Sequence, residues 1–215
     1  MSDVTGRASP RDDRSLSAVL GGIDIYLLDQ LLRGRIRPGM TVFEVGSGGG
    51  RNLTYFLREG YEVFAIDRDQ EAIARTRRLK DELAPGLPDS NFRVESIEET
   101  TFPEGSADFL ISCAVLHFAR SDEEFGTALD ASWRLLAPGG IFFCRLASRI
   151  GMEGRVRRLG GRRYLQPDGT ERYLVDEKIL LDCTARLGGE LIDPIKTTVV
   201  QNQRCMTTWV VWKPR

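Results

Sequence analysis

Hydrophobic positions along the chain follow two different spacings. In residues 22–36 the apolar side chains recur every three or four positions, which predicts an amphipathic helix. Elsewhere, short runs are almost wholly apolar or β-branched. Such runs are typical of strands in a parallel sheet, because both faces of that sheet are covered. The runs that predict strands are 40–45, 61–67, 91–96, 107–115 and 141–147.

Helical spacing returns between these strands. Helices are expected at 51–60, 70–84 and 122–136, and Pro85 and the turn at 137–140 end the last two. Strands that alternate with helices through short connections predict right-handed βαβ units, and therefore a parallel sheet covered by helices.

The last third of the chain has another pattern. Residues 149–175 are polar and rich in arginine, and a helix is expected at 176–188. The β-rich runs 196–200 and 205–212 are close enough to pair as an antiparallel hairpin at the sheet edge. The predicted fold is α/β and Rossmann-like, doubly wound, with a seven-stranded, mostly parallel sheet, an antiparallel C-terminal hairpin strand and helices on both faces. We expect residues 1–18 to be a flexible tail and residues 19–215 to be a single domain.

Composition and charge exclude several classes of protein. The 215 residues are 41% apolar and 28% charged, with a net charge of −1. This balance gives no general attraction to nucleic acid or to an anionic membrane. No apolar run is long enough to span a bilayer, and the four cysteines form no C-x-x-C pair. We therefore expect a cytoplasmic protein with reduced thiols, no metal, and neither a nucleic-acid nor a membrane partner. No feature indicates an oligomeric state.

The stretch VFEVGSGGGRN, residues 42–52, is the first candidate for a binding site. It places four glycines between a strand and a helix, where a ligand can lie against bare backbone and the helix N-terminus. The spacing differs from the G-x-G-x-x-G of dinucleotide sites and lacks the G-K-[ST] ending of phosphate loops. Glu44 precedes the glycines, and a carboxylate there suits a ligand with positive charge.

Asp67 adds a second acid at the end of the second strand, 21 residues after Gly46. A carboxylate at this position can accept hydrogen bonds from both hydroxyls of a ribose. Taken singly, Asp67 is also consistent with a cap for the next helix, and the glycines with a tight turn. The order of strand, acid, glycines, helix, strand and acid favours a ligand that combines a ribose with a cationic group.

This arrangement resembles the class I S-adenosylmethionine-dependent methyltransferases over residues 22–213. Within that class, GGGRNLTYFLREGYEVFAIDRDQEAI is similar to the tellurite-resistance-type small-molecule methyltransferases. The resemblance implies S-adenosyl-L-methionine as cofactor, S-adenosyl-L-homocysteine as product, and a small-molecule methyl acceptor. The cofactor-binding residues it implies are Glu44, Gly46, Ser47, Gly48, Asn52, Asp67, Arg68, Ser96, Ile97, Cys113 and His117. After the third strand, the acidic residue of the family corresponds either to Glu95 or to Glu98.

The methyl group on a sulfonium is already electrophilic, so a general base is needed only if the acceptor must lose a proton. His117 is the only histidine and is either that base or a residue of the pocket wall. Arg204 resembles an arginine in the C-terminal strand of the tellurite-type enzymes, where it is a candidate catalytic and substrate-binding residue.

Residues 149–175 follow the fifth strand, where related enzymes insert elements that cover the substrate. We expect either such a lid, with Arg162 and Arg163 binding an anionic group of the acceptor, or a solvated loop. Tyr26, on the helix before the first strand, is expected at the entrance or in the packing.

Other functions remain open from the sequence. A methyltransferase that acts on exocyclic amino groups of nucleic acid usually carries an N-P-P-Y-like turn after the fourth strand, and this chain has SCAVLH there. A protein methyltransferase and a cofactor-binding protein without enzymatic activity are further alternatives. A nicotinamide-dependent oxidoreductase is disfavoured by the glycine spacing.

Overall fold

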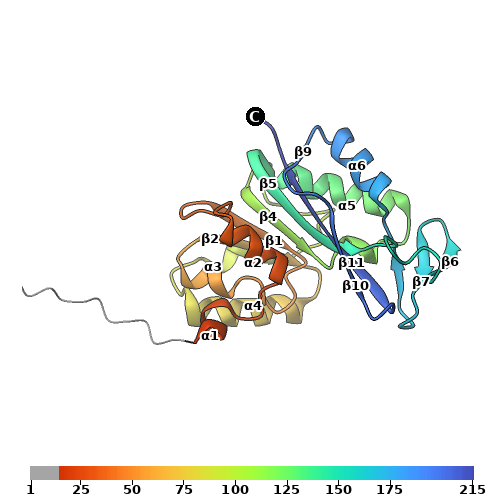
Figure 1. Ribbon diagram of the computed structural model, residues 1–215. Helices are drawn as coiled ribbons and strands as arrows, with labels where there is room; N and C mark the ends of the chain where they lie inside the picture. Colours follow the sequence, from red (N-terminus) through yellow and green to blue (C-terminus); the bar gives the residue numbers. More distant parts are fainter. Residues whose placement is uncertain (1–14) are drawn as a thin grey trace, which may run out of the picture.

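A central sheet forms the middle layer of the protein. The computed structural model describes residues 15–215, and its main sheet has the strand order β10-β11-β5-β4-β1-β2-β3, with the short strand β9 beside β11 (Figure 1). The strands are β1 (Thr41–Val45), β2 (Glu62–Asp67), β3 (Phe92–Val94), β4 (Ala107–Cys113), β5 (Leu136–Ala147), β9 (Glu190–Leu191), β10 (Lys196–Val200) and β11 (Arg204–Trp212). The pairs from β3 to β5 are parallel, whereas β11 runs antiparallel to β5 and β10. The predicted mostly parallel sheet with a C-terminal hairpin is confirmed.

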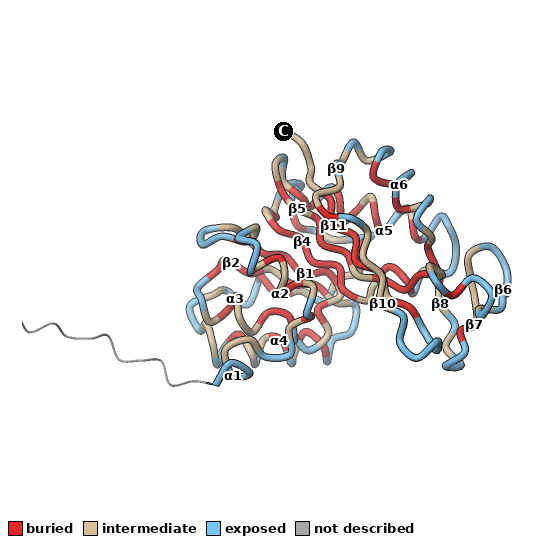
Figure 2. The backbone as a smooth tube through the Cα atoms, viewed as in Figure 1, coloured by how far each residue is buried: buried red, intermediate tan, exposed pale blue. Residues whose placement is uncertain are grey.

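Helices cover both faces of this sheet, as predicted. One buried cluster joins the sheet to α2, α3 and α4, and the other joins it to α5 and α6. Burial is concentrated in the central strands (Figure 2). The helices are α1 (Leu16–Leu20), α2 (Ile25–Leu32), α3 (Thr54–Arg58), α4 (Gln70–Leu83), α5 (Asp122–Leu135) and α6 (Glu177–Arg186), with short 3₁₀ turns η1 (Asp89–Asn91) and η2 (Leu116–Phe118). None of the helices in residues 15–215 is long and apolar enough to cross a membrane.

The N-terminal part differs from the prediction. Residues 1–14 of the expected tail lie outside the described residues, but Ser15 caps helix α1, so a helix begins inside the predicted 1–18 segment. The helix expected at 22–36 is shorter, because Asp24 caps it by accepting a hydrogen bond from the Tyr26 N–H at 2.9 Å. Gly34 follows its end with φ +66°, a left-handed conformation that glycine adopts readily.

Residues 149–175 contain a separate three-stranded antiparallel sheet, named here the small sheet. Its strands are β6 (Arg157–Gly160), β7 (Arg163–Leu165) and β8 (Glu171–Tyr173), and it lies beside the β10–β11 end of the main sheet (Figure 1). Tyr173 anchors it, because its buried ring stacks on Phe125 at 4.8 Å and its hydroxyl donates to Asp122 at 2.8 Å. The segment is therefore ordered structure with one face on the domain.

Candidate cofactor and acceptor site

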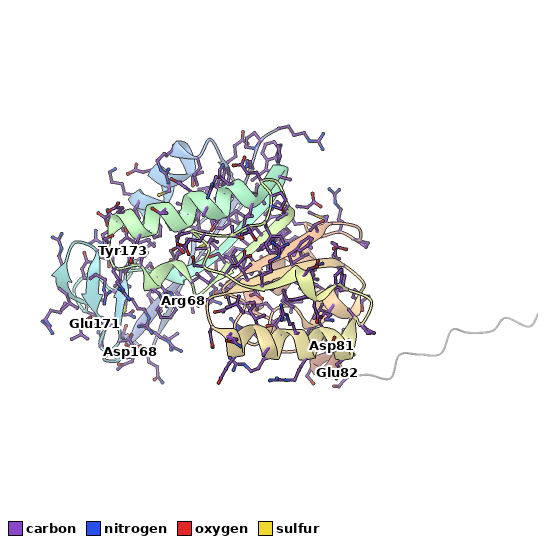
Figure 3. The ribbon with its side chains drawn as sticks, turned by 180° about the vertical axis from the view of Figure 1, so that it is seen from behind. Arg68, Asp81, Glu82, Asp168, Glu171 and Tyr173 are labelled. Atoms are coloured by element: carbon purple, nitrogen blue, oxygen red, sulfur yellow. The ribbon has the colours of Figure 1, made fainter. Side chains whose placement is uncertain are left out.

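A cavity of about 600 Å³ opens at the carboxyl ends of β1, β2 and β4. Ligands of doubly wound folds bind at this edge, where the strand order reverses. Five of the predicted cofactor-binding residues line the cavity together: Gly46, Asp67, Arg68, Ser96 and Ile97. Arg68 is labelled at this edge in Figure 3.

Two glycines of the turn lie where a side chain would clash with a neighbour or strain the backbone. Gly46 has φ +64°, and a Cβ atom there would lie 2.5 Å from Cγ2 of Val115. Gly48 has φ +56°, and its N–H donates to Oδ2 of Asp67 at 2.8 Å. Ser47 between them is buried, and its hydroxyl has no hydrogen-bond partner among residues 15–215. The turn therefore offers bare backbone and one unpaired hydroxyl close to the cavity.

Asp67 is held in place by two backbone N–H groups. Oδ2 accepts from Gly48, and Oδ1 accepts from Asp69 at 2.9 Å. A carboxylate has about four lone-pair positions, so each oxygen keeps capacity for a further donor on the cavity side. This geometry fits two adjacent ribose hydroxyls.

Glu44 lies on β1 behind the turn and is 2% exposed. Oε1 accepts from Nδ2 of Asn52 at 2.6 Å, whereas Oε2 has no partner within the described chain. Burial raises the pKa of this carboxyl from 4.5 to about 8. A buried carboxylate with one unpaired oxygen fits an ammonium group, so the residues present fit the methionine end of S-adenosylmethionine.

Glu95 and Glu98, the two candidate acids after β3, differ in their surroundings. The Glu95 carboxylate accepts hydrogen bonds from the Thr101 N–H at 2.9 Å and from the hydroxyls of Thr100 and Thr101, and this lowers its pKa. Glu95 thus holds the loop that carries Ser96 and Ile97. Glu98 is exposed and also lines the cavity.

His117 and Cys113 are buried and are not among the residues that line the cavity. Nδ1 of His117 accepts from the Ala147 N–H at 3.0 Å, and burial lowers its pKa to about 4. The neutral imidazole then carries its proton on Nε2, which makes it a donor at that atom and disfavours the general-base role. Sγ of Cys113 accepts from Arg51 at 3.2 Å, and burial raises its pKa to about 12, so the thiol stays protonated.

The arginines predicted to bind substrate take part in other contacts. Nη1 of Arg162 lies 3.1 Å from Asp176, and Nη2 of Arg163 lies 3.0 Å from Glu171 of the small sheet. Glu171 is labelled in Figure 3. Arg204 is exposed at the start of β11. None of the three lines the cavity.

A second polar cluster occupies the α2 side of the same sheet edge. Oδ2 of Asp24 lies 2.6 Å from Nη1 of Arg145, and the Arg145 guanidinium lies 4.6 Å from the centre of the Tyr26 ring. The Tyr26 hydroxyl is 2.6 Å from the Thr198 hydroxyl of β10. Asp24, Tyr26 and Arg145 thus form one connected cluster. Arg145 is not among the residues predicted from the sequence; its signal there is a single arginine within the apolar strand IFFCRLA.

No group of three or more histidine, cysteine, aspartate or glutamate side chains that could hold a metal ion occurs within residues 15–215.

Comparisons with known proteins agree with this geometry. Residues 43–144, just under half of the chain, match the family described as a methyltransferase domain. A curated relative, the tRNA N(3)-methylcytidine methyltransferase trm140 of Schizosaccharomyces pombe, is 25% identical over 157 residues. This match covers 66% of the chain but 49% of the relative, so the chain spans about half of that protein's length.

Solved structures share the whole fold. The 1,6-didemethyltoxoflavin-N1-methyltransferase of Burkholderia thailandensis, solved with bound S-adenosylhomocysteine, has a TM-score of 0.69 and 18% identity, with 91% of this chain and 80% of that chain covered. The [4+2]-cyclase SpnF has a TM-score of 0.65 and 16% identity, with 87% and 80% covered. At such identities the likeness establishes the fold and not the reaction. Residues 43–144 thus match a methyltransferase-domain family, and the chain shares the Rossmann-like α/β fold of these solved structures.

Proposed function

We propose that the protein is an S-adenosyl-L-methionine-dependent methyltransferase with a small, anionic methyl acceptor. The observation that carries the cofactor part is Glu44, whose buried carboxylate keeps one unpaired oxygen directly behind a glycine turn. Asp67, at the end of the neighbouring strand, supplies the site for the ribose hydroxyls. Together these groups match the cationic and sugar ends of one ligand.

The cofactor supplies an electrophilic methyl group when bound. Glu44 would hold the ammonium group, Asp67 the ribose, and the backbone of Gly46 and Gly48 would lie against the ligand between them. The segment after β4 would exclude water from the reacting centre, because Val115 and Leu116 line the cavity there. No general base is required in this scheme, and the proton on Nε2 of His117 is consistent with that.

The acceptor side supports a small molecule. Helix α2 is tied to β10 by the hydrogen bond between Tyr26 and Thr198, and the Tyr26 ring also contacts Arg145 of β5. An edge spanned by this contact favours a compact acceptor over a folded macromolecule. The relation to tellurite-type enzymes stays a prediction, because the acceptor could equally be a carboxylate.

A tRNA acceptor is the second candidate, and two observations favour it. The curated relative is named for a tRNA base, and Phe118 at the cavity is 52% exposed with Arg172 lying 4.9 Å from its ring centre. An exposed aromatic ring next to an arginine can stack on an unpaired base. Acidic residues at the same opening, Glu98 and Glu124, oppose a polyanion.

Transfer of labelled methyl groups from the cofactor separates the two candidates. Purified protein would be incubated with small thiols, oxyanions of selenium and tellurium, small carboxylates, and bulk tRNA, with Asp67→Ala as the inactive control. We expect label in a small anionic acceptor. Label in tRNA alone would contradict the small-molecule proposal, and label in no acceptor with intact cofactor binding would favour a non-enzymatic role.

A further inference from the structure

Arg145 is a charged side chain within a strand that is otherwise largely apolar and buried. It lies near the carboxyl end of β5, where its side chain is 13% exposed. In register it faces Cys113 of β4 on one side and Thr208 of β11 on the other. A guanidinium at this depth loses much of its hydration, so its N–H groups need acceptors from the protein or from a ligand.

The described residues supply hydrogen-bond acceptors for only part of the Arg145 guanidinium. Nη1 donates to Oδ2 of Asp24 at 2.6 Å, and the Tyr26 ring lies 4.6 Å from the guanidinium carbon. Nε is buried and has no hydrogen-bond partner among residues 15–215. Nη2 makes no hydrogen bond within the same residues. The Nε–Nη2 edge is the side of a guanidinium that binds a carboxylate or an oxyanion with two parallel hydrogen bonds.

The position of Arg145 links this free edge to the cofactor site. Glu44 accepts from Asn52 at 2.6 Å, Oδ1 of Asn52 accepts from the Asp24 N–H at 3.0 Å, and Asp24 binds Arg145. Arg145 is also the direct neighbour of Cys113, the last residue of β4. An anion on the Nε–Nη2 edge would therefore sit beside the methionine end of the cofactor.

The charges around this position favour an anion. Arg51 contributes a second guanidinium, whose Nη2 is 4.0 Å from Oδ2 of Asp24 and 3.2 Å from Sγ of Cys113. Asp24 is the one carboxylate within 4.0 Å of these two guanidinium groups among residues 15–215. Two guanidinium groups thus share one carboxylate, which favours a further anion beside them.

We propose that Arg145 is the anion anchor of the acceptor site, and that its Nε–Nη2 edge binds a carboxylate or oxyanion group of the methyl acceptor. Asp24 holds Nη1 and so orients the guanidinium, while Tyr26 supports its face. This inference rests on the proposed function and deepens it, because it assigns the acceptor's negative group to a named side chain in place of the small-sheet arginines.

Nuclear magnetic resonance of the arginine Nε–H groups tests the anchor directly. The Arg145 signal would be assigned by its loss in Arg145→Gln and followed while acetate or inorganic phosphate is added to protein saturated with S-adenosylhomocysteine. Acetamide, which is neutral, serves as the ligand control, and Arg134→Gln on the exposed face of α5 serves as the variant control. Comparing acetate with phosphate shows which anion geometry the site prefers.

We expect a saturable shift of the Arg145 signal with at least one of the anions, and none with acetamide. Arg145→Gln should weaken anion binding by about tenfold or more, as for the loss of a charged hydrogen bond. Asp24→Asn keeps a good helix cap and removes the neighbouring negative charge, so it should bind the anion more tightly than the wild type. If Asp24 and Arg145 form only a structural ion pair, Asp24→Asn should bind the anion no more tightly than the wild type.

Three results would overturn the anchor: an Arg145 signal unmoved by both anions, unchanged anion affinity in Arg145→Gln, or anion binding in Asp24→Asn that is no tighter than in the wild type. If Arg145→Gln does not fold, Asp24→Asn alone decides. Failure of the proposed function can be told apart from failure of the anchor. If S-adenosylhomocysteine does not bind, the proposed function is refuted. If it binds but the anions do not shift the Arg145 signal, only the anchor is refuted.

Discussion

The burial of Glu44 should make the protein less stable at neutral pH, and Glu44→Gln tests this. Gln keeps the oxygen that accepts from Asn52 and removes the ionisable group. Burial raises the pKa of Glu44 from 4.5 in the unfolded chain to about 8 in the fold. The stability that the protonated carboxyl contributes is therefore complete below pH 4.5 and is lost as the pH rises to about 8.

The size of this loss of stability follows from how far the pH of the measurement lies above the pKa of the unfolded carboxyl and below that of the folded one. At pH 7 the unfolded carboxyl is ionised and the folded one is mostly protonated, so 2.5 pKa units at 1.36 kcal/mol each give about 3 kcal/mol. We expect Glu44→Gln to raise the free energy of unfolding by up to this amount at pH 7, and by little near pH 4.5. Urea denaturation at several pH values measures the difference.

The same variant should lose cofactor binding. An ammonium group requires the ionised carboxylate, so at pH 7, one unit below the pKa of about 8, binding should release about 0.9 proton per site. Calorimetry of S-adenosylhomocysteine in two buffers of different ionisation enthalpy counts that proton, and Glu44→Gln should release none and bind more weakly. Equal stability of both proteins from pH 5 to pH 8, or unchanged affinity and proton release, would refute the reasoning.

Two other predictions concern the glycine turn and the histidine. Gly46→Ala should destabilise the protein by about 1–3 kcal/mol in urea denaturation, because its Cβ would lie 2.5 Å from Val115. Gly48→Ala, with φ +56° and no atom within 4 Å of its Cβ, should cost less, and an equal loss in both would show that the contact with Val115 is unimportant. The His117 imidazole, with its pKa near 4, should not titrate between pH 5.5 and 8 in nuclear magnetic resonance spectra; a midpoint near 6.5 would contradict its buried hydrogen bond.

Local patterns predicted the parts of the molecule that depend on neighbours in sequence. The glycines, Glu44 and Asp67 follow strands directly, so strand order alone brings their positions to one edge of the sheet. Arg145 was not predicted because its contacts are with Asp24 and Tyr26, which lie about 120 residues away in the chain.

The small sheet was missed for a similar reason. Its strands are three or four residues long, too short for a clear alternation of apolar and polar positions. Tyr173 is buried only because Phe125 and Asp122 of another element receive it. The arginines in this segment look free in the sequence, yet Arg162 and Arg163 have acidic partners in the folded chain.

The central claim is that this edge binds S-adenosylmethionine through Asp67 and the glycine turn. Isothermal titration of the wild-type protein and Asp67→Ala with S-adenosylhomocysteine and with NAD tests it most directly. The account predicts micromolar-range binding of S-adenosylhomocysteine, on the order of −8 kcal/mol, lost in Asp67→Ala, and no binding of NAD. Binding of NAD in place of S-adenosylhomocysteine, or full affinity in Asp67→Ala, would contradict it.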